Sequence, residues 1–93
     1  MNNVIHTGAN VISATEALEV FRMYHPNLDV TPVMHGTRGL RAKIRRITGI
    51  TPTKEQITVL MSSTGGYVGK VNRYFMYPRE KFNQACFSAV GLK

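Results

Sequence analysis

Glycine and proline residues interrupt this chain so often that no helix or strand can be long. The interruptions that fall between apolar runs are Pro26, Pro32, Gly36, Gly49, Gly65, Gly66 and Pro78. Proline removes a backbone donor and disfavours a helical conformation in the residue before it, and glycine readily adopts the backbone that ends a helix. The longest apolar stretches, such as residues 74–77, are far below the roughly 20 residues that a membrane-spanning helix needs. We therefore expect several short elements and no membrane span.

Length and composition favour one small domain. Ninety-three residues, 43% of them hydrophobic, suit a single compact core and exclude a large catalytic scaffold. The single Cys86 cannot form an internal disulfide, and residues 1–12 have neither a basic start nor a long apolar run. We expect a soluble protein of a reducing, cytoplasmic compartment, with residues 1–12 as an arm or short edge strand and residues 13–93 as the domain.

Four segments carry helix signals. Ser13 and Glu16 have the spacing of a capping box, and the apolar period that follows stops at Pro26. Further helices are predicted over residues 37–49, with Thr37 as N-cap, over residues 52–63, and from Pro78 onward. The residues expected to face inward are Ala14, Ala17, Leu18, Phe21, Tyr24, Leu40, Ile44, Ile47, Ile57, Leu60, Met61, Phe82, Ala85 and Cys86.

Residues 53–63 leave an alternative open. Two start signals and the stop at Gly65 favour a helix, but the β-rich run 57–61 also suits a strand. Any strand within residues 28–34 is expected to be short or to lie at a sheet edge, because Pro32 cannot donate to a ladder. Residues 66–77 are predicted to form a hairpin, in which the aromatic side chains serve mainly for packing. Together these elements predict an α+β fold.

Positive charge is concentrated in the middle of the chain. The net charge is +7, and residues 38–81 hold ten of the twelve basic side chains but only two of the five acidic ones. On the predicted second helix, Arg38, Arg41 and Arg45 lie opposite Leu40, Ile44 and Ile47. Arginine suits bidentate contact with phosphate, so this concentration indicates a polyanionic or acidic partner.

The order of the predicted elements over residues 13–77 resembles that of the winged helix-turn-helix DNA-binding superfamily. The residues that carry the resemblance are the arginine helix 40–48, the turn 49–51, the third helix 52–63 and the wing 66–77. The resemblance implies that the third helix enters the major groove with Lys54, Glu55, Thr58, Val59 and Ser62 near base edges. It also implies that Arg38, Arg41, Arg45, Arg46, Lys70 and Arg73 contact phosphates.

Chemistry other than binding has little support in the sequence. The five carboxylates are scattered, and no pair has the spacing of shared acid–base work or of a hard-metal site. His6, His25, His35 and Cys86 match no common zinc-ligand spacing. The glycine pairs lack the Lys-Ser/Thr that follows a phosphate loop. We expect a protein without catalytic residues, metal or cofactor.

Two functions follow as hypotheses. The first is a small non-enzymatic protein that binds double-stranded DNA, such as a transcription regulator or an accessory factor of a virus or mobile element. The second is an inhibitor or adaptor whose basic face docks on an acidic host protein, an interpretation favoured if residues 56–62 form a strand. RNA binding through the hairpin aromatic residues is a third interpretation and requires exposed stacking rings.

Overall fold

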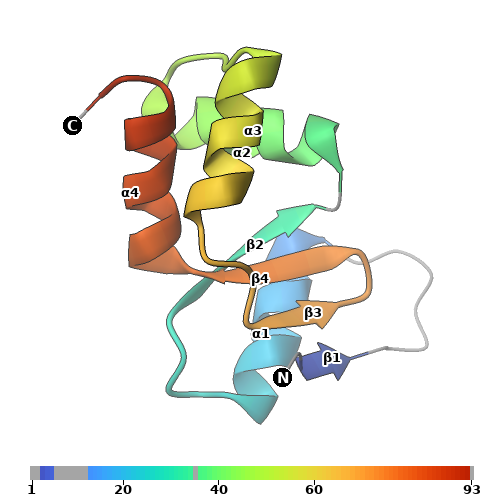
Figure 1. Cartoon of the computed structure of the whole chain (residues 1–93). Coiled ribbons are helices and arrows are strands. Elements are labelled where there is room, and N and C mark those ends of the chain that lie inside the picture. Colours follow the sequence, from blue (N-terminus) through green and yellow to red (C-terminus); the bar gives the residue numbers. More distant parts are fainter. Residues whose placement is uncertain (1–2, 6–12, 35, 93) are drawn as a thin grey trace.

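The computed structural model describes residues 3–5, 13–34 and 36–92. The elements in chain order are β1 (Asn3–Ile5), α1 (Ala14–Tyr24), β2 (Val30–Met34), α2 (Thr37–Thr48), α3 (Lys54–Ser63), β3 (Gly69–Val71), β4 (Tyr74–Pro78) and α4 (Arg79–Ala89). These helices and strands form a small α+β domain (Figure 1). None of the helices in the described residues is long and apolar enough to cross a membrane.

The strands form one sheet in the order β1-β3-β4-β2. β4 pairs with β2 and β3 in antiparallel register, and β1 joins β3 in parallel, with Asn3 opposite Gly69. The β3–β4 hairpin closes through Asn72 and Arg73, and Asn72 takes the left-handed conformation at φ 51°. β2 lies at the edge of the sheet, which is where the sequence placed a strand containing Pro32.

The sheet separates two apolar clusters, so the single core suggested by chain length is wrong. α1 covers one face, where Phe21 packs among Val30, Val71 and Met76. On the other side, α2, α3 and α4 enclose a cluster that includes Ile44, Leu60, Phe82 and Cys86. Side chains alternate along β4, because successive strand residues point to opposite faces. α1 lies behind the sheet in Figure 1, and the other helices gather above it.

The helices begin and end where the sequence signals predicted. Ser13 Oγ accepts from the Glu16 amide at 3.1 Å, and Glu16 Oε1 accepts from the Ser13 amide at 3.2 Å. The same capping box closes between Thr53 and Gln56 at the start of α3. Gly49 ends α2 in the left-handed conformation, at φ 79°. At the start of α2, however, Gly36 is the N-cap, and Thr37 is the first helical residue.

In the structure, residues 54–63 form helix α3, so the strand alternative for residues 53–63 is wrong. Two residues expected to face inward are nevertheless exposed, Tyr24 at 63% and Met61 at 50%. Tyr24 closes α1, and Met61 borders the open side of α3, so neither is covered by the sheet or by another helix. Residues 1–2 and 6–12 of the expected arm lie outside the described residues, and 3–5 form β1.

Candidate nucleic-acid interface

α2 carries an exposed row of arginines, which we call the basic face. Its members are Arg38, Arg41, Arg45 and Arg46, and all four are exposed. Leu40 and Ile44 are buried on the opposite side of the helix, as the helical period requires. The burial of these two side chains fixes the rotation of α2, and that rotation directs the guanidinium groups outward.

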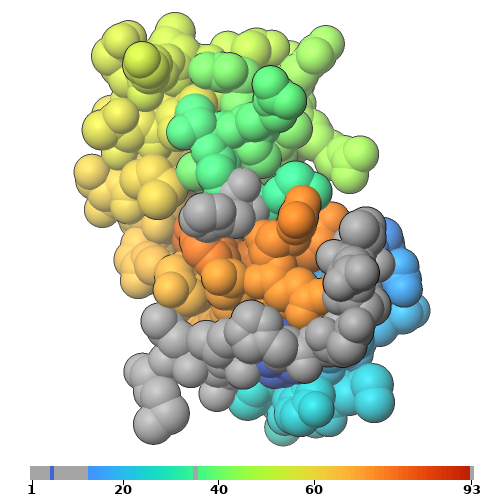
Figure 2. All heavy atoms as spheres, turned by 90° about the vertical axis from the view of Figure 1, so that its right-hand side faces the viewer, coloured from blue at the N-terminus to red at the C-terminus, as the bar shows by residue number. Residues whose placement is uncertain are grey.

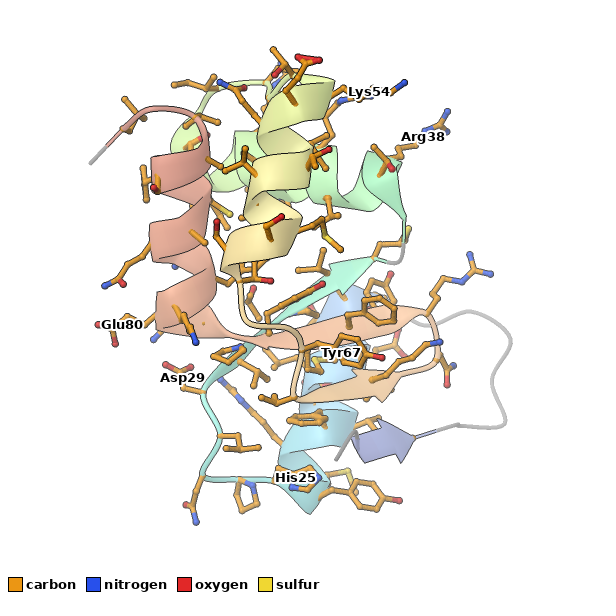
Figure 3. The ribbon with its side chains drawn as sticks, viewed as in Figure 1. His25, Asp29, Arg38, Lys54, Tyr67 and Glu80 are labelled. Atoms are coloured by element: carbon orange, nitrogen blue, oxygen red, sulfur yellow. The ribbon has the colours of Figure 1, made fainter. Side chains whose placement is uncertain are left out.

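No carboxylate neutralises the basic face among the described residues, whose single ion pair joins Arg79 and Asp29 at 2.7 Å. The hydrogen bond from Arg79 holds the pKa of Asp29 below its usual value. In Figure 3, Arg38 and Lys54 extend toward the upper right, whereas Asp29 and Glu80 lie at the left, near the start of α4. The positive potential at α2 is therefore open to a partner.

α3 presents Lys54, Thr58 and Ser62 to solvent. Lys54 begins this helix on the same side of the molecule as Arg38 and so extends the basic face (Figure 3). The Thr58 hydroxyl donates to the carbonyl of Lys54 at 3.1 Å, and the Ser62 hydroxyl donates to the carbonyl of Thr58 at 3.2 Å. With those hydrogens engaged, the two hydroxyl groups offer acceptor lone pairs to a partner.

The hairpin contributes its two cations in different ways. Arg73 is exposed in the turn. Lys70 is only partly exposed, and its ammonium lies 5.3 Å from the centroid of the Phe75 ring, where the ring face attracts it. Tyr67 stacks on the same ring, with the centroids 4.5 Å apart. The expectation that the hairpin aromatic residues serve for packing is confirmed, since Tyr74 and Tyr77 are buried as well.

The predicted site residues thus come together in part. Arg38 and Lys54 share one end of the molecule with the rest of α2, whereas Lys70 and Arg73 belong to the β3–β4 hairpin. Figure 2 shows α2 and α3 in green and yellow at one end, the hairpin in orange at the middle, and α1 in blue and cyan at the other end. A partner must be long enough to pass along this side if it is to touch both groups of cations.

Lys43 is a cation that the sequence analysis did not single out. It is half-buried at the border between the basic face and the buried face of α2. Burial is the main cause that lowers the pKa of its ammonium group, and the positive charge of Arg46 lowers it further. The sequence could have indicated that Lys43 lies near Arg46, because residues three positions apart are neighbours on a helix surface.

An apolar groove of about 350 Å³ lies beside the basic face, between α2, α3 and the sheet. Its lining includes Met34, Thr37, Leu40, Thr58, Met61 and Phe75. No charged residue lines it in the described part of the chain, and Met34 and Met61 are about half exposed there. Thr58, which the sequence predicts near base edges, therefore lies on the exposed surface of α3 and also lines this groove.

Groups suited to catalysis or metal binding are sparse in the described residues. These residues contain no group of three or more His, Cys, Asp or Glu side chains that could hold a metal ion. The Cys86 thiol is buried, and burial raises its pKa to about 11, so the group stays protonated at neutral pH. A protonated, buried thiol is a packing group and a poor nucleophile.

Comparison of this chain with known protein families, curated proteins and solved structures finds no match.

Proposed function

We propose that this protein is a small, non-enzymatic, basic protein that binds double-stranded DNA through the basic face of α2 and the start of α3. The observation that carries the proposal is the row of four exposed arginines on one helix, without a carboxylate partner among the described residues. Guanidinium groups contact phosphate oxygens in bidentate geometry, and several of them on one helix can neutralise several phosphates of a duplex.

The arginines would fix the protein on the backbone, and α3 would contribute a modest reading of sequence. Thr58 and Ser62 offer hydroxyl oxygens, and Lys54 is the cation of that helix. Phosphate contacts position a protein without carrying sequence information, so most of the affinity would be common to all duplexes. A strong preference for guanine is not expected from the side chains on α3.

The winged-helix resemblance belongs to this proposal. It is supported by the helical α3 and by the antiparallel order β2-β4-β3 around the hairpin. In such an arrangement α3 would enter the major groove and the hairpin would follow the neighbouring backbone. The hairpin turn spans only Asn72 and Arg73, so the wing would reach the backbone chiefly through Arg73.

The first experiment measures the salt dependence of binding to a labelled duplex by fluorescence anisotropy. Five cations, the basic face and Lys54, imply a slope near −4.5 for log affinity against log salt concentration, from counterion release at about 0.9 per phosphate. Absence of binding at low salt would remove the proposal. A slope near zero would remove its electrostatic mechanism.

Paired variants locate the interface. Arg41→Gln with Arg45→Gln should weaken binding to all duplexes alike, by a factor of about 10 to 100, while the thermal unfolding temperature stays unchanged. The matched control, Arg22→Gln with Lys81→Gln, removes the same net charge from exposed positions on α1 and α4. An equal loss in the control pair would mean that overall charge, and not the basic face, captures DNA.

A separate variant tests α3. Thr58→Glu places a carboxylate on the exposed side of the helix at little cost to folding, since substitutions at exposed sites usually change stability by less than about 0.5 kcal/mol. If α3 enters the groove of DNA, repulsion between the carboxylate and phosphates should abolish binding. A folded Thr58→Glu variant that binds as well as the parent would show that α3 does not read the duplex.

The apolar groove favours a second candidate, an adaptor that docks on an acidic protein. Met34 and Met61 present apolar surface there, and Arg38 and Lys54 lie on the same side of the molecule. Met61→Ser should then weaken binding of an acidic peptide that carries one aromatic anchor, and it should leave duplex binding unchanged. Peptide binding that is insensitive to Met61→Ser would remove this candidate.

A further inference from the structure

We propose that a second groove, between the start of α1, the edge strand β2 and α2, binds a small organic anion with a phosphate or carboxylate head and an apolar body. This groove has a volume of about 440 Å³. That size lies within the range of small-molecule sites, which are mostly apolar and carry a few convergent polar groups. The inference does not rest on DNA binding.

Three cations line one wall of this groove. Arg38, Lys43 and Arg46 all come from α2, and they line the same space because α2 runs along it. The described lining residues include no Asp or Glu, and none of the three cations forms an ion pair with a described carboxylate. An anion entering the groove would therefore meet donors that have not been neutralised by the protein.

Lys43 is the cation best placed to distinguish this groove from an ordinary charged surface. Its side chain is half-buried, so part of its hydration is already lost. The pKa of its ammonium is lowered by that burial and by the neighbouring charge of Arg46. The opposite charge of a bound anion would offset both effects, because it stabilises the protonated ammonium in a place that water reaches only in part.

The opposite wall of the groove is apolar. Ala14, Pro32, Met34 and Tyr74 supply it, from α1, β2 and β4. Gly39 fixes the end of the groove where α2 meets β2, since a Cβ at that position would lie 2.9 Å from the carbonyl carbon of Met34. A free inorganic ion would leave these apolar surfaces uncovered. An anion with an aromatic or aliphatic body would cover them.

The test uses isotope-labelled protein and four probes, followed by two-dimensional NMR. Phenyl phosphate and benzoate carry a head and a body, inorganic phosphate carries the head alone, and benzyl alcohol carries the body alone. We expect phenyl phosphate or benzoate to bind at least about tenfold more tightly than either single-feature probe. Comparison of the two then decides whether the head is a phosphate or a carboxylate. The amide shifts should be confined to the groove, at Ala14, Met34, Gly39 and Ala42.

Three variants and one control complete the test. Lys43→Gln should weaken binding of the tighter probe about tenfold, as expected for the loss of one charge-assisted hydrogen bond. Because Lys43 is half-buried, Arg46→Gln and Ala42→Glu provide exposed changes in the same groove that should also weaken binding. Lys81→Gln, an exposed cation on α4, should leave binding unchanged.

Two results would overturn the proposal. One is phenyl phosphate and benzoate binding no more tightly than inorganic phosphate, which would mean that the apolar wall takes no part. The other is an equal loss in Lys81→Gln and in the groove variants, which would mean that the probes respond to overall positive charge. Shifts spread over all basic segments would support the same conclusion.

Discussion

At the scale of single residues, Gly39 shows how one missing side chain positions a helix. It lies in the first turn of α2, where the sequence suggests only a weak start for the helix. In the structure its Cα faces the backbone of Met34 so closely that no Cβ fits without movement. Glycine therefore allows α2 to begin directly against the edge strand.

Gly39→Ala should consequently destabilise the protein, although alanine is the better helix former. The gain in helix propensity is about 1 kcal/mol, and the displacement of backbone at Met34 should exceed it, for a net loss of about 1 to 3 kcal/mol. Thermal and urea unfolding measure the change. Ala42→Gly, at an exposed position of the same helix, is the control and should cost only the propensity difference. A more stable Gly39→Ala protein would contradict the close approach.

The buried thiol of Cys86 should make the stability of the protein depend on pH. Burial raises the pKa of its thiol from an ordinary 9.0 to about 11, so the folded state keeps a proton that the unfolded state releases. This stabilisation is fully present below pH 9 and is lost as pH rises toward 11, and it amounts to about 2 to 3 kcal/mol. Urea unfolding from pH 8 to 11 should therefore show a steeper decline in the parent than in Cys86→Ala. Parallel curves would contradict the assignment.

At the scale of elements, α1 and α3 show how strongly the ends of a helix can specify it, because a capping box closes the first turn of each. α3 is the clearest case, because its central residues suit a strand as well as a helix. Thr53 and Gln56 close a reciprocal pair of hydrogen bonds at its first turn. These bonds satisfy amide groups that the helix itself leaves without partners, and so they favour the helical state.

Thr53→Ala should therefore cost about 0.5 to 2 kcal/mol of stability. Thr53→Ser keeps the hydroxyl oxygen and is the matched control, with a smaller expected loss. Chemical denaturation gives the free energy of unfolding, and amide exchange of residues 54–58 reports on the first turn of α3. Equal stability of Thr53→Ala and the parent would show that packing alone holds this helix.

Sequence signals of this local kind predicted the helices, the edge position of Pro32 and the hairpin. They missed what depends on distant partners. Met61 and Tyr24 have the period of inward residues, but no element covers them in the structure. The groove that Lys43 lines with Ala14 and Pro32 was not predictable either, because its walls come from segments that are distant in the sequence. In the candidate site, the exposure of the α2 arginines was predictable from the helical period of that segment. The contact of the Lys70 ammonium with the Phe75 ring was not predictable.

At the scale of the whole molecule, two apolar clusters share one sheet. β2 supplies Val30 to the cluster under α1 and Val33 to the cluster of the other helices. β4 does the same with Met76 and Tyr77. Because β2 and β4 contribute side chains to both clusters, disruption of one cluster would also disturb the strands that hold the other. We therefore expect the molecule to unfold as one unit.

Phe21→Ala and Phe82→Ala test that unity from opposite sides of the sheet. Each side chain is almost fully buried, so each change should cost about 3 to 5 kcal/mol. In both variants, NMR signals from α1 and from α4 should disappear over the same range of urea concentration. Separate transitions for the two helices would show that the sheet does not couple the clusters.

The parallel pairing of β1 with β3 has a consequence for the order in which the strands of the sheet assemble during synthesis. Asn3 pairs opposite Gly69, so during synthesis the first of these strands leaves the ribosome long before its partner exists. Closing so long a loop costs more conformational entropy than closing the adjacent hairpin. We therefore expect β1 to join a sheet edge that β3 and β4 have already formed, and until then the outer edge of β3 would be open to any other extended chain nearby.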